Sequence, residues 1–313
     1  MPNTLQLTGL DAQNPLGFLA ALGLLRIVDE HARRNALARP SLAFVDDGVL
    51  HARIGSALES VDALIEVVLS DALARGDDAL LQLCYDDHGA ALPAGATGKR
   101  DLKPSPETAR ALLDRVADGP RLTSDLAAAF FSELVQDNNG NTKPTALHFT
   151  AGQQQFLDMV DALRRGVVAE DLHEALLGPW RGESTLPSLS WDATMARQYA
   201  LRAGNPSKEK RGSVAGANYL AVFGLSYLPV TVQRGKLVTT CVVGGWKDSI
   251  FTWPTWSRAA TSNAAASLLR MDLRRLSSRE RAALGISHVF AARITRSDQG
   301  GYGGFSPAEV VFG

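Results

Sequence analysis

The chain has 313 residues, of which 45% are hydrophobic and 21% charged, a composition typical of a soluble globular protein with one large domain or two. Its formal net charge of −1 excludes a protein that coats nucleic acid by charge alone, but leaves room for a local basic patch. Two cysteines in apolar contexts, without a CxxC, HExxH or Cys/His cluster, argue against a structural zinc site and predict a cytoplasmic protein with reduced thiols.

The first informative element is residues 14–34, which we expect to form a long and almost wholly apolar helix. An asparagine stands at its capping position, and Pro15 fits the first helical position, where a missing N–H costs nothing. Gly17 and Gly23 each cost a helix about 1 kcal/mol relative to alanine, so we expect another backbone to pack closely on them. The apolar run stops at Arg26, short of the roughly 20 residues of a membrane span, and no basic segment precedes it as in a signal peptide. The sequence therefore predicts a buried central helix and no membrane contact.

The rest of the first third mixes strands and helices. Alternating apolar residues predict a strand at 4–10 and a hairpin formed by 41–47 and 49–55. Apolar residues with helical spacing predict a helix at about 56–74. Residues 79–86 fit either a strand or a short buried helix.

The middle third is predicted to be mostly helical and to carry two polar loops. The loops are the Pro/Gly-rich stretch 88–107 and the asparagine-rich stretch 136–145. Thr150 could cap the third of the helices, which we expect at 106–117, 123–135, 147–166 and 168–180.

After Trp180 a basic loop interrupts the chain, and the remaining elements follow it. We expect helices at 214–227, 261–270 and 277–284 and strands at 230–235, 236–244, 248–254 and 287–297. The sequence thus predicts a mixed α+β fold with a helix-rich middle and small antiparallel sheets in the N- and C-terminal parts. A weak boundary separates an N-terminal region, 1–180, from a C-terminal region, 181–313, unless the two form one domain.

The basic loop around residues 202–211 is the first candidate for function. Flexible Lys and Arg side chains together with Asn commonly contact phosphates, and the helix start that follows would offer free N–H groups to an anion. The alternative is a solvated surface loop before a tightly packed helix. The candidate nucleic-acid-binding residues of this segment are Arg202, Asn205, Lys208, Lys210, Arg211 and Asn218.

Three further segments could add contacts to nucleic acid. Their cations would contribute salt-dependent affinity rather than sequence specificity. The asparagines could read base edges, coordinate a backbone or simply complete turns. The glycine-rich C-terminal segment could let Tyr302 or Phe305 stack on a base, or be disordered. The candidate residues are Lys99, Arg100 and Lys103 in one loop, Asn138, Asn139, Asn141 and Lys143 in the next, and the cluster of Arg274, Arg275, Arg279 and Arg281.

No motif for catalysis or cofactor binding is present. The chain lacks a GxSxG, a Walker loop and a GxGxxG after a strand, so we expect no catalytic residue, no cofactor and no metal ligand. A metal nuclease would need carboxylates from separate strands, but the acidic pairs lie beside loops, where Asp commonly caps turns. We expect His148 to be a hydrogen-bonded core residue and the five tryptophans to pack between elements, although Trp253 and Trp256 could instead line a partner surface. The candidate nuclease residues are Asp46, Asp47, Asp86, Asp87 and His88.

Beyond these physical arguments, the pattern LxGLxAxNPLGFLAALGLLR at 7–26 resembles the N-terminal signature of CRISPR-associated proteins from subtype I-G (formerly I-U) loci. It is similar to the family found as an extension of the helicase-nuclease and to the start of the large Cascade subunit. Later segments fit the same resemblance in order: LHFTAGQQQFL (147–157), LSWD (189–192), YALRAGNPS (199–207), GANYLAVFGLSYLP (216–229) and FTWPTWS (251–257).

The resemblance implies a non-enzymatic subunit of an RNA-guided, DNA-targeting effector complex. Its partners would be other CRISPR effector proteins together with guide RNA, target DNA or both. Two alternatives stay open, a metal-dependent nuclease of a phage-defence system and a scaffold that binds only proteins.

Overall fold

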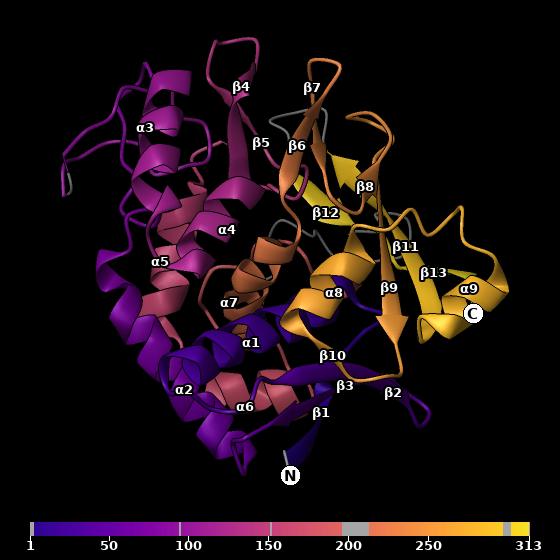
Figure 1. Ribbon diagram of the computed structural model, residues 1–313. Coiled ribbons are helices and arrows are strands. Elements are labelled where there is room, and N and C mark those ends of the chain that lie inside the picture. Colours follow the sequence, from indigo (N-terminus) through magenta and orange to yellow (C-terminus); the bar gives the residue numbers. More distant parts are fainter. Residues whose placement is uncertain (1–2, 94, 151, 196–212, 297–301, 313) are drawn as a thin grey trace, which may run out of the picture.

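Helix α1 (Pro15–Arg34) is the centre of the fold, which we describe from a computed structural model covering residues 3–93, 95–150, 152–195, 213–296 and 302–312 (Figure 1). All sixteen residues from Pro15 to Glu30 are buried. The side chain of Asn14 caps the helix by accepting a hydrogen bond from the N–H of Leu16 at 3.1 Å. The predicted buried central helix is therefore confirmed, with the predicted cap and start.

Helix α7 (Ala215–Gly224) packs against α1 at two glycines, and every residue of α7 is buried. A Cβ atom on Gly23 would lie 1.7 Å from the carbonyl oxygen of Leu220, and one on Gly224 would lie 2.1 Å from that of Leu19. Each helix thus brings a glycine against the backbone of the other, which no larger residue permits. The chain continues after α7 as a 3-10 turn, Leu225–Tyr227.

The N-terminal sheet lies beside α1 and is antiparallel, with strand order β1-β3-β2-β10. The predicted hairpin is formed by β2 (Ser41–Asp46) and β3 (Leu50–Ser56), and β1 (Asn3–Asp11) pairs with β3. Strand β10 (Ala260–Thr261) joins this sheet from the last third of the chain. Helix α2 (Val61–Ala74) follows the hairpin and ends in a 3-10 turn, Arg75–Asp77.

The C-terminal sheet is built on the pair β9 (Ile250–Trp256) and β11 (Ile286–Arg296). On the far side of β9 lies β8 (Val242–Val243), and on the far side of β11 lie β12 (Gly303–Phe305) and β13 (Glu309–Phe312). The glycine-rich end of the chain, where disorder was one expectation, therefore contributes two strands.

Buried tryptophans of β9 attach the C-terminal sheet to the N-terminal elements. The indole N–H of Trp253 donates to the carbonyl of Ala12 at 2.9 Å, and that of Trp256 donates to the carbonyl of Leu42 at 2.7 Å. The rings also pack on Phe18 of α1. Since both indoles are buried, the expectation that they could line a partner surface was wrong.

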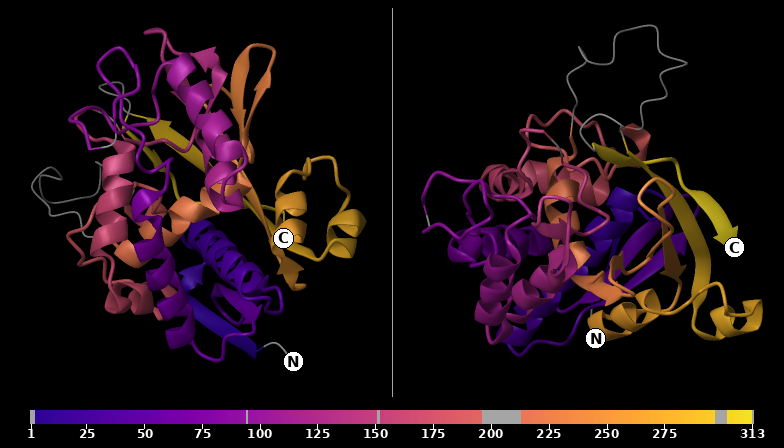
Figure 2. Two further views of the ribbon diagram at one scale, coloured as in Figure 1. Left: turned by 60° about the vertical axis from the view of Figure 1, so that its left-hand side comes forward. Right: turned by 90° about the horizontal axis from the view of Figure 1, so that it is seen from above.

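The helical middle of the chain carries one hairpin, and a second hairpin follows α7. In the left view of Figure 2, the pink helices of this part and the gold helices near the C-terminus lie on opposite sides of indigo α1. The remaining elements are α3 (Pro106–Ala117), α4 (Arg121–Phe130), β4 (Phe131–Gln136), β5 (Thr142–Pro144), α5 (Phe156–Gly166), α6 (Ala169–Leu177), a 3-10 turn at Ala193–Met195, β6 (Val230–Gln233), β7 (Lys236–Thr239), α8 (Ser262–Leu269) and α9 (Ser278–Ala283).

Three sequence predictions differ from this structure. The helix predicted at 123–135 ends at Phe130, because residues 131–136 pair as β4 with β5. The helix predicted from 147 begins only at Phe156, and the hydroxyl of Thr150 contacts His148 instead of capping a helix. Residues 79–86 form turns rather than a strand or a helix.

The fold class is as predicted, a mixed α+β arrangement with small antiparallel sheets. Helix α7 and strands β9 and β10, from the second half of the chain, pack on elements of the first half. None of the helices within the described ranges is long and apolar enough to cross a membrane.

Candidate nucleic-acid interface

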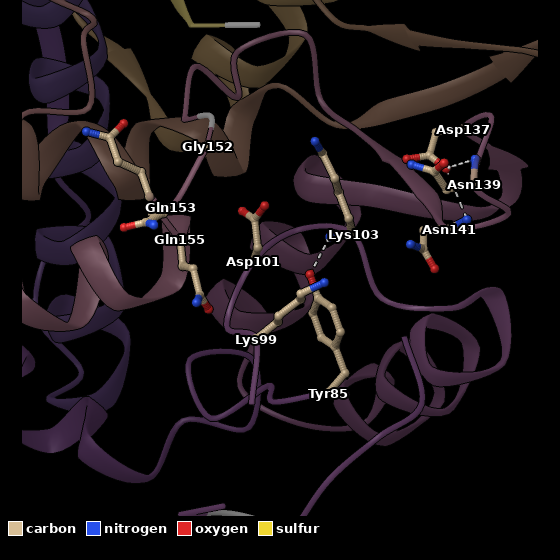
Figure 3. A pocket seen from close by; sticks show the side chains of 11 residues that line it. Tyr85, Lys99, Asp101, Lys103, Asp137, Asn139, Asn141, Gly152, Gln153 and Gln155 are labelled. Carbon is tan, nitrogen blue, oxygen red and sulfur yellow. Dashed lines mark hydrogen bonds between the residues drawn. The ribbon is translucent and has the colours of Figure 1, made fainter. Parts of the chain in front are cut away.

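A polar cavity of about 560 Å³ opens where three loops meet (Figure 3). Two of them are loops that the sequence had singled out, 95–103 and 136–145, and the third precedes α5. In Figure 3, Gln153 and Gln155 lie on one side and the asparagines on the other, with Lys103 between them. The lining residues are Tyr85, Lys99, Asp101, Lys103, Asp137, Asn139, Asn141, Gly152, Gln153, Gln154 and Gln155.

The asparagine side of the cavity is the turn between β4 and β5. The carboxylate of Asp137 accepts hydrogen bonds from the N–H groups of Asn139 at 2.8 Å and Asn141 at 3.2 Å. Gly140 adopts a φ of +80° there, a conformation that glycine takes without strain. The Asp137 carboxylate thus closes the turn through backbone N–H groups, and the Asn139 side chain stays exposed at the tip.

The lysine side of the cavity is held by Tyr85. Its backbone exchanges two hydrogen bonds with Lys99, at 3.0 and 2.7 Å, and its hydroxyl accepts from the N–H of Lys103 at 3.3 Å. Burial, together with the nearby Asp101, raises the pKa of the Tyr85 phenol well above its usual value, so the hydroxyl stays protonated. Tyr85 therefore holds the backbone at Lys99 and at Lys103, and the two lysine side chains extend from these fixed positions.

The partly buried Asp101 and the buried His148 form a pair at the edge of the cavity. The carboxylate of Asp101 lies 2.7 Å from Nε2 of His148 and accepts from the N–H of Phe156 at 3.2 Å. Burial acts to raise the pKa of Asp101, but hydrogen bonding and electrostatic attraction from His148 outweigh it, so this pKa is lowered. The prediction of a hydrogen-bonded core histidine is confirmed.

The contact of Thr150 with His148 does not make this pair catalytic. The hydroxyl of Thr150 lies 2.7 Å from Nε2, the same ring nitrogen that contacts Asp101. A hydroxyl–imidazole–carboxylate triad needs one ring nitrogen for each partner. The three residues therefore stabilise the chain before α5 and do not activate a nucleophile.

The cations of the loop 95–103 differ in how freely they can meet a ligand. Lys99 is exposed and pairs with the exposed Asp87 at 3.0 Å, and Lys103 makes no ion pair among the described residues. Arg100 instead pairs with Asp158 of α5 at 2.9 Å and donates to a backbone carbonyl. Lys99 and Lys103 line the cavity, whereas Arg100 attaches its loop to α5.

Next to the cavity, an aromatic residue stands at the surface against a partly buried cation. The guanidinium of Arg296 lies 3.8 Å from the ring centroid of Trp246 and 5.5 Å from that of Phe149. Nζ of Lys143 lies 6.0 Å from the Trp246 ring. Trp246 is 52% exposed, so the expectation that all five tryptophans are packed between elements was wrong for this one.

Short segments join this aromatic site to the cavity. Lys143 follows Asn141 by two residues, and Phe149 precedes Gly152 by three. A Cβ on Gly152 would lie 2.9 Å from the hydroxyl of Tyr302, whose side chain is 45% exposed. By contrast, Phe305 is buried against two other phenylalanines, so the prediction that it stacks on a base was wrong.

The other predicted contacts fall into three groups. Asn218 is buried and its amide is satisfied within the fold, accepting from the N–H of Leu189 at 2.9 Å and donating to Val214 and Ser213, so it cannot meet a ligand as predicted. Arg274 and Arg275 are exposed in the turn before α9, and α9 lies on the opposite side of the molecule from α3 (Figure 1). The remaining candidates of the basic loop, Arg202, Asn205, Lys208, Lys210 and Arg211, lie outside the described residues.

The carboxylates considered for a nuclease sit in separate turns. Asp46 accepts from the N–H of Gly48 at 3.2 Å, and Asp86 accepts from those of His88 and Ala90 at 2.8 and 2.9 Å. The bonds to Asp86, chiefly the one from Ala90, lower its pKa. Within the described ranges no three His, Cys, Asp or Glu side chains lie close enough together to hold a metal ion.

Two parts of this interface were not among the sequence candidates. Gln153, Gln154 and Gln155 were placed inside a helix, where alternate side chains would diverge, and no local signal marked them as a loop. Trp246 stands between two glycines and a lysine in GGWKD, a turn-like context that could have marked it as exposed.

Comparisons with protein-family models, curated proteins and solved structures found no match to this chain, so its site is interpreted from its own geometry.

Proposed function

We propose that this protein is a non-enzymatic subunit of an RNA-guided CRISPR effector complex and that it contacts the backbone of nucleic acid at the polar cavity. One observation carries the nucleic-acid part. Two loops that the sequence suggested separately as nucleic-acid contacts, 95–103 and 136–145, converge on one cavity. The effector setting, with its protein partners and its guide RNA or target DNA, rests on the sequence resemblance.

The cavity cations suit a phosphate ligand. Lys103 has no ionic partner among the described residues, and Lys99 has only the exposed Asp87. Surface pairs of this kind contribute about 0–1 kcal/mol, so a phosphate can replace Asp87 at small cost. The amides around the lysines can add neutral donors to phosphate and sugar oxygens.

Reversing the two cavity charges tests the proposal. We expect Lys99→Glu with Lys103→Glu to weaken binding of a labelled oligonucleotide at least tenfold at low salt, measured by fluorescence anisotropy. For every phosphate group that the variant no longer binds, the slope of log affinity against log salt should fall by about 0.7 for a single strand. The oligonucleotide should stay intact in Mg²⁺ or Mn²⁺ if the subunit is not an enzyme.

A matched control changes the same charge elsewhere. Arg274→Glu with Arg275→Glu alters two exposed cations that do not line the cavity and should leave binding at low salt nearly unchanged. An equal decrease in affinity for the two double variants would mean that general charge, rather than the cavity, attracts the ligand. Failure of the unaltered protein to bind any nucleic acid at low salt would favour the scaffold that binds only proteins.

A further inference from the structure

Three groups from distant parts of the chain are layered beside the cavity. Phe149 precedes α5, Arg296 ends β11, and Trp246 lies between β8 and β9. The guanidinium of Arg296 lies over both rings, 3.8 Å from the centroid of Trp246 and 5.5 Å from that of Phe149. We call Trp246 with this support the aromatic shelf.

The cation in the shelf is fixed and charged. The guanidinium of Arg296 donates to the carbonyls of Ala146 at 2.6 Å and His148 at 3.3 Å, and no described carboxylate pairs with it. Burial lowers the pKa of Arg296 to about 10, which still leaves it protonated at neutral pH. Its place against the indole therefore does not depend on a movable ionic partner.

The outer part of Trp246 remains open. One face of the ring rests on the guanidinium, so the 52% of the side chain that is exposed belongs to the other face and the edges. A large aromatic ring held rigidly at the surface gives up little conformational entropy when a flat ligand stacks on it. Stacking of one nucleic-acid base on such a ring contributes about 1–3 kcal/mol.

A second line of contacts connects the shelf with the lysines. Lys143 approaches the Trp246 ring from β5, and the same hairpin carries Asn139 and Asn141 into the cavity. The hydroxyl of Tyr302, whose side chain is also exposed, lies close to Gly152 in the cavity lining. Aromatic rings interleaved with cations and amides are the usual surface of proteins that bind single strands.

We infer that the preferred ligand is a single strand, with one unpaired base stacked on Trp246 and the adjoining backbone continuing to Lys103 and Lys99. A duplex offers phosphates to the lysines but no free base face to the shelf, so only a single strand uses both. This inference rests on the proposed nucleic-acid function and adds the class of strand and the residue that selects it.

Removing the ring separates the two contributions. Trp246→Ala should weaken binding of a single strand by about fivefold to 150-fold, the equivalent of 1–3 kcal/mol, and leave binding of a duplex of the same sequence unchanged. Trp246→Phe keeps a ring and should retain most of the affinity. The melting temperature should stay constant because the side chain is half exposed.

Fluorescence gives a second readout that a structural role would not change. A base stacked on the indole should quench the emission of Trp246, seen as the difference between the unaltered protein and Trp246→Phe on addition of a single strand. Absence of this quenching, or an equal decrease in affinity for single strand and duplex in Trp246→Ala, would overturn the inference. The proposed function would still stand if the Lys99→Glu, Lys103→Glu variant bound more weakly, and both would fall if the unaltered protein bound neither strand.

Discussion

At the scale of single residues, buried polar groups hold the chain in place around the cavity and along α1. Asn14 caps α1 with its oxygen and, with its amide nitrogen, donates to Asp192 at 2.7 Å, so one residue ties the helix start to a segment far along the chain. Asp29, fully buried in α1, pairs with Arg39 and Arg33. Asp101 likewise holds the loop 95–103 in place, through its contacts with His148 and with the N–H of Phe156 at the start of α5.

The lowered pKa of Asp101 predicts a pH-dependent contribution to stability. Because the folded-state pKa lies below the unfolded value of 3.8, the ionised carboxylate stabilises the protein above that pH. Asp101→Asn should reduce the free energy of unfolding by about 1.5 to 3 kcal/mol at neutral pH. The difference in stability between the variant and the unaltered protein should shrink as the pH falls below 3.8. Urea unfolding at several pH values between 3 and 7 measures it. A difference that stayed constant over this range would show that Asp101 acts without its charge.

At the scale of elements, predictions succeeded where local chemistry and tertiary packing agreed. Asn14 caps α1 as predicted, α3 begins at Pro106 as expected, and the 41–55 hairpin has the alternation of a half-buried sheet. For α2 the predicted start was four or five residues too early, since residues before Ser60 belong to the turn after β3.

Predictions failed where apolar runs fit more than one structure. Residues 131–136 continue the apolar run of α4, and only pairing with β5, which sequence periodicity does not register, makes them a strand. The helical spacing lies at 156–163, and extending the helix back to 147 was wrong. The carbonyl of Leu147 accepts from the indole of Trp191, a partner absent from any local window, and residues 147–155 form the loop that carries the three glutamines to the cavity. The other two loops of the cavity were foreseen as candidates for contact with nucleic acid, but not that they would meet.

The glycine contact between α1 and α7 predicts both the direction and the size of the change in the free energy of unfolding when Gly23 is replaced by alanine. In an exposed helix, replacing glycine by alanine stabilises by about 1 kcal/mol. In Gly23→Ala the new Cβ would overlap the Leu220 carbonyl, so we expect a decrease of about 3 kcal/mol or more in the free energy of unfolding, measured in urea. The control Gly76→Ala, whose Cβ would have its nearest neighbour at 4.0 Å, should change stability by less than about 0.5 kcal/mol. A stable Gly23→Ala protein would mean that the two helices are not in close backbone contact.

At the scale of the whole molecule, a net charge of −1 restricts how nucleic acid can bind. Without a general positive field, attraction must come from a local site, and long-range steering of a polyanion is weak. Such a protein gains occupancy on nucleic acid mainly when partner proteins hold it there, since linked binding raises the effective concentration.

This argument predicts that partners are needed for tight binding. When the protein is co-expressed with the proteins encoded beside it and purified through an affinity tag, we expect effector proteins and a guide RNA to co-purify, identified by mass spectrometry and RNA sequencing. The Lys99→Glu, Lys103→Glu variant should keep the proteins and show less RNA. Purification of the protein alone, free of nucleic acid and of neighbours, would contradict the effector setting.

The interleaving of α1 with α7 and β9 has a consequence for biosynthesis. Helix α1 leaves the ribosome early, but α7 begins about 180 residues after α1 ends, which takes roughly 10 to 40 s at usual translation rates. Throughout that interval the buried helix lacks α7, which packs most extensively on it in the finished protein. The yield of folded protein in a cell should therefore depend on chaperones that shield the emerging helix. Slow translation should increase the fraction of the protein that is lost to aggregation.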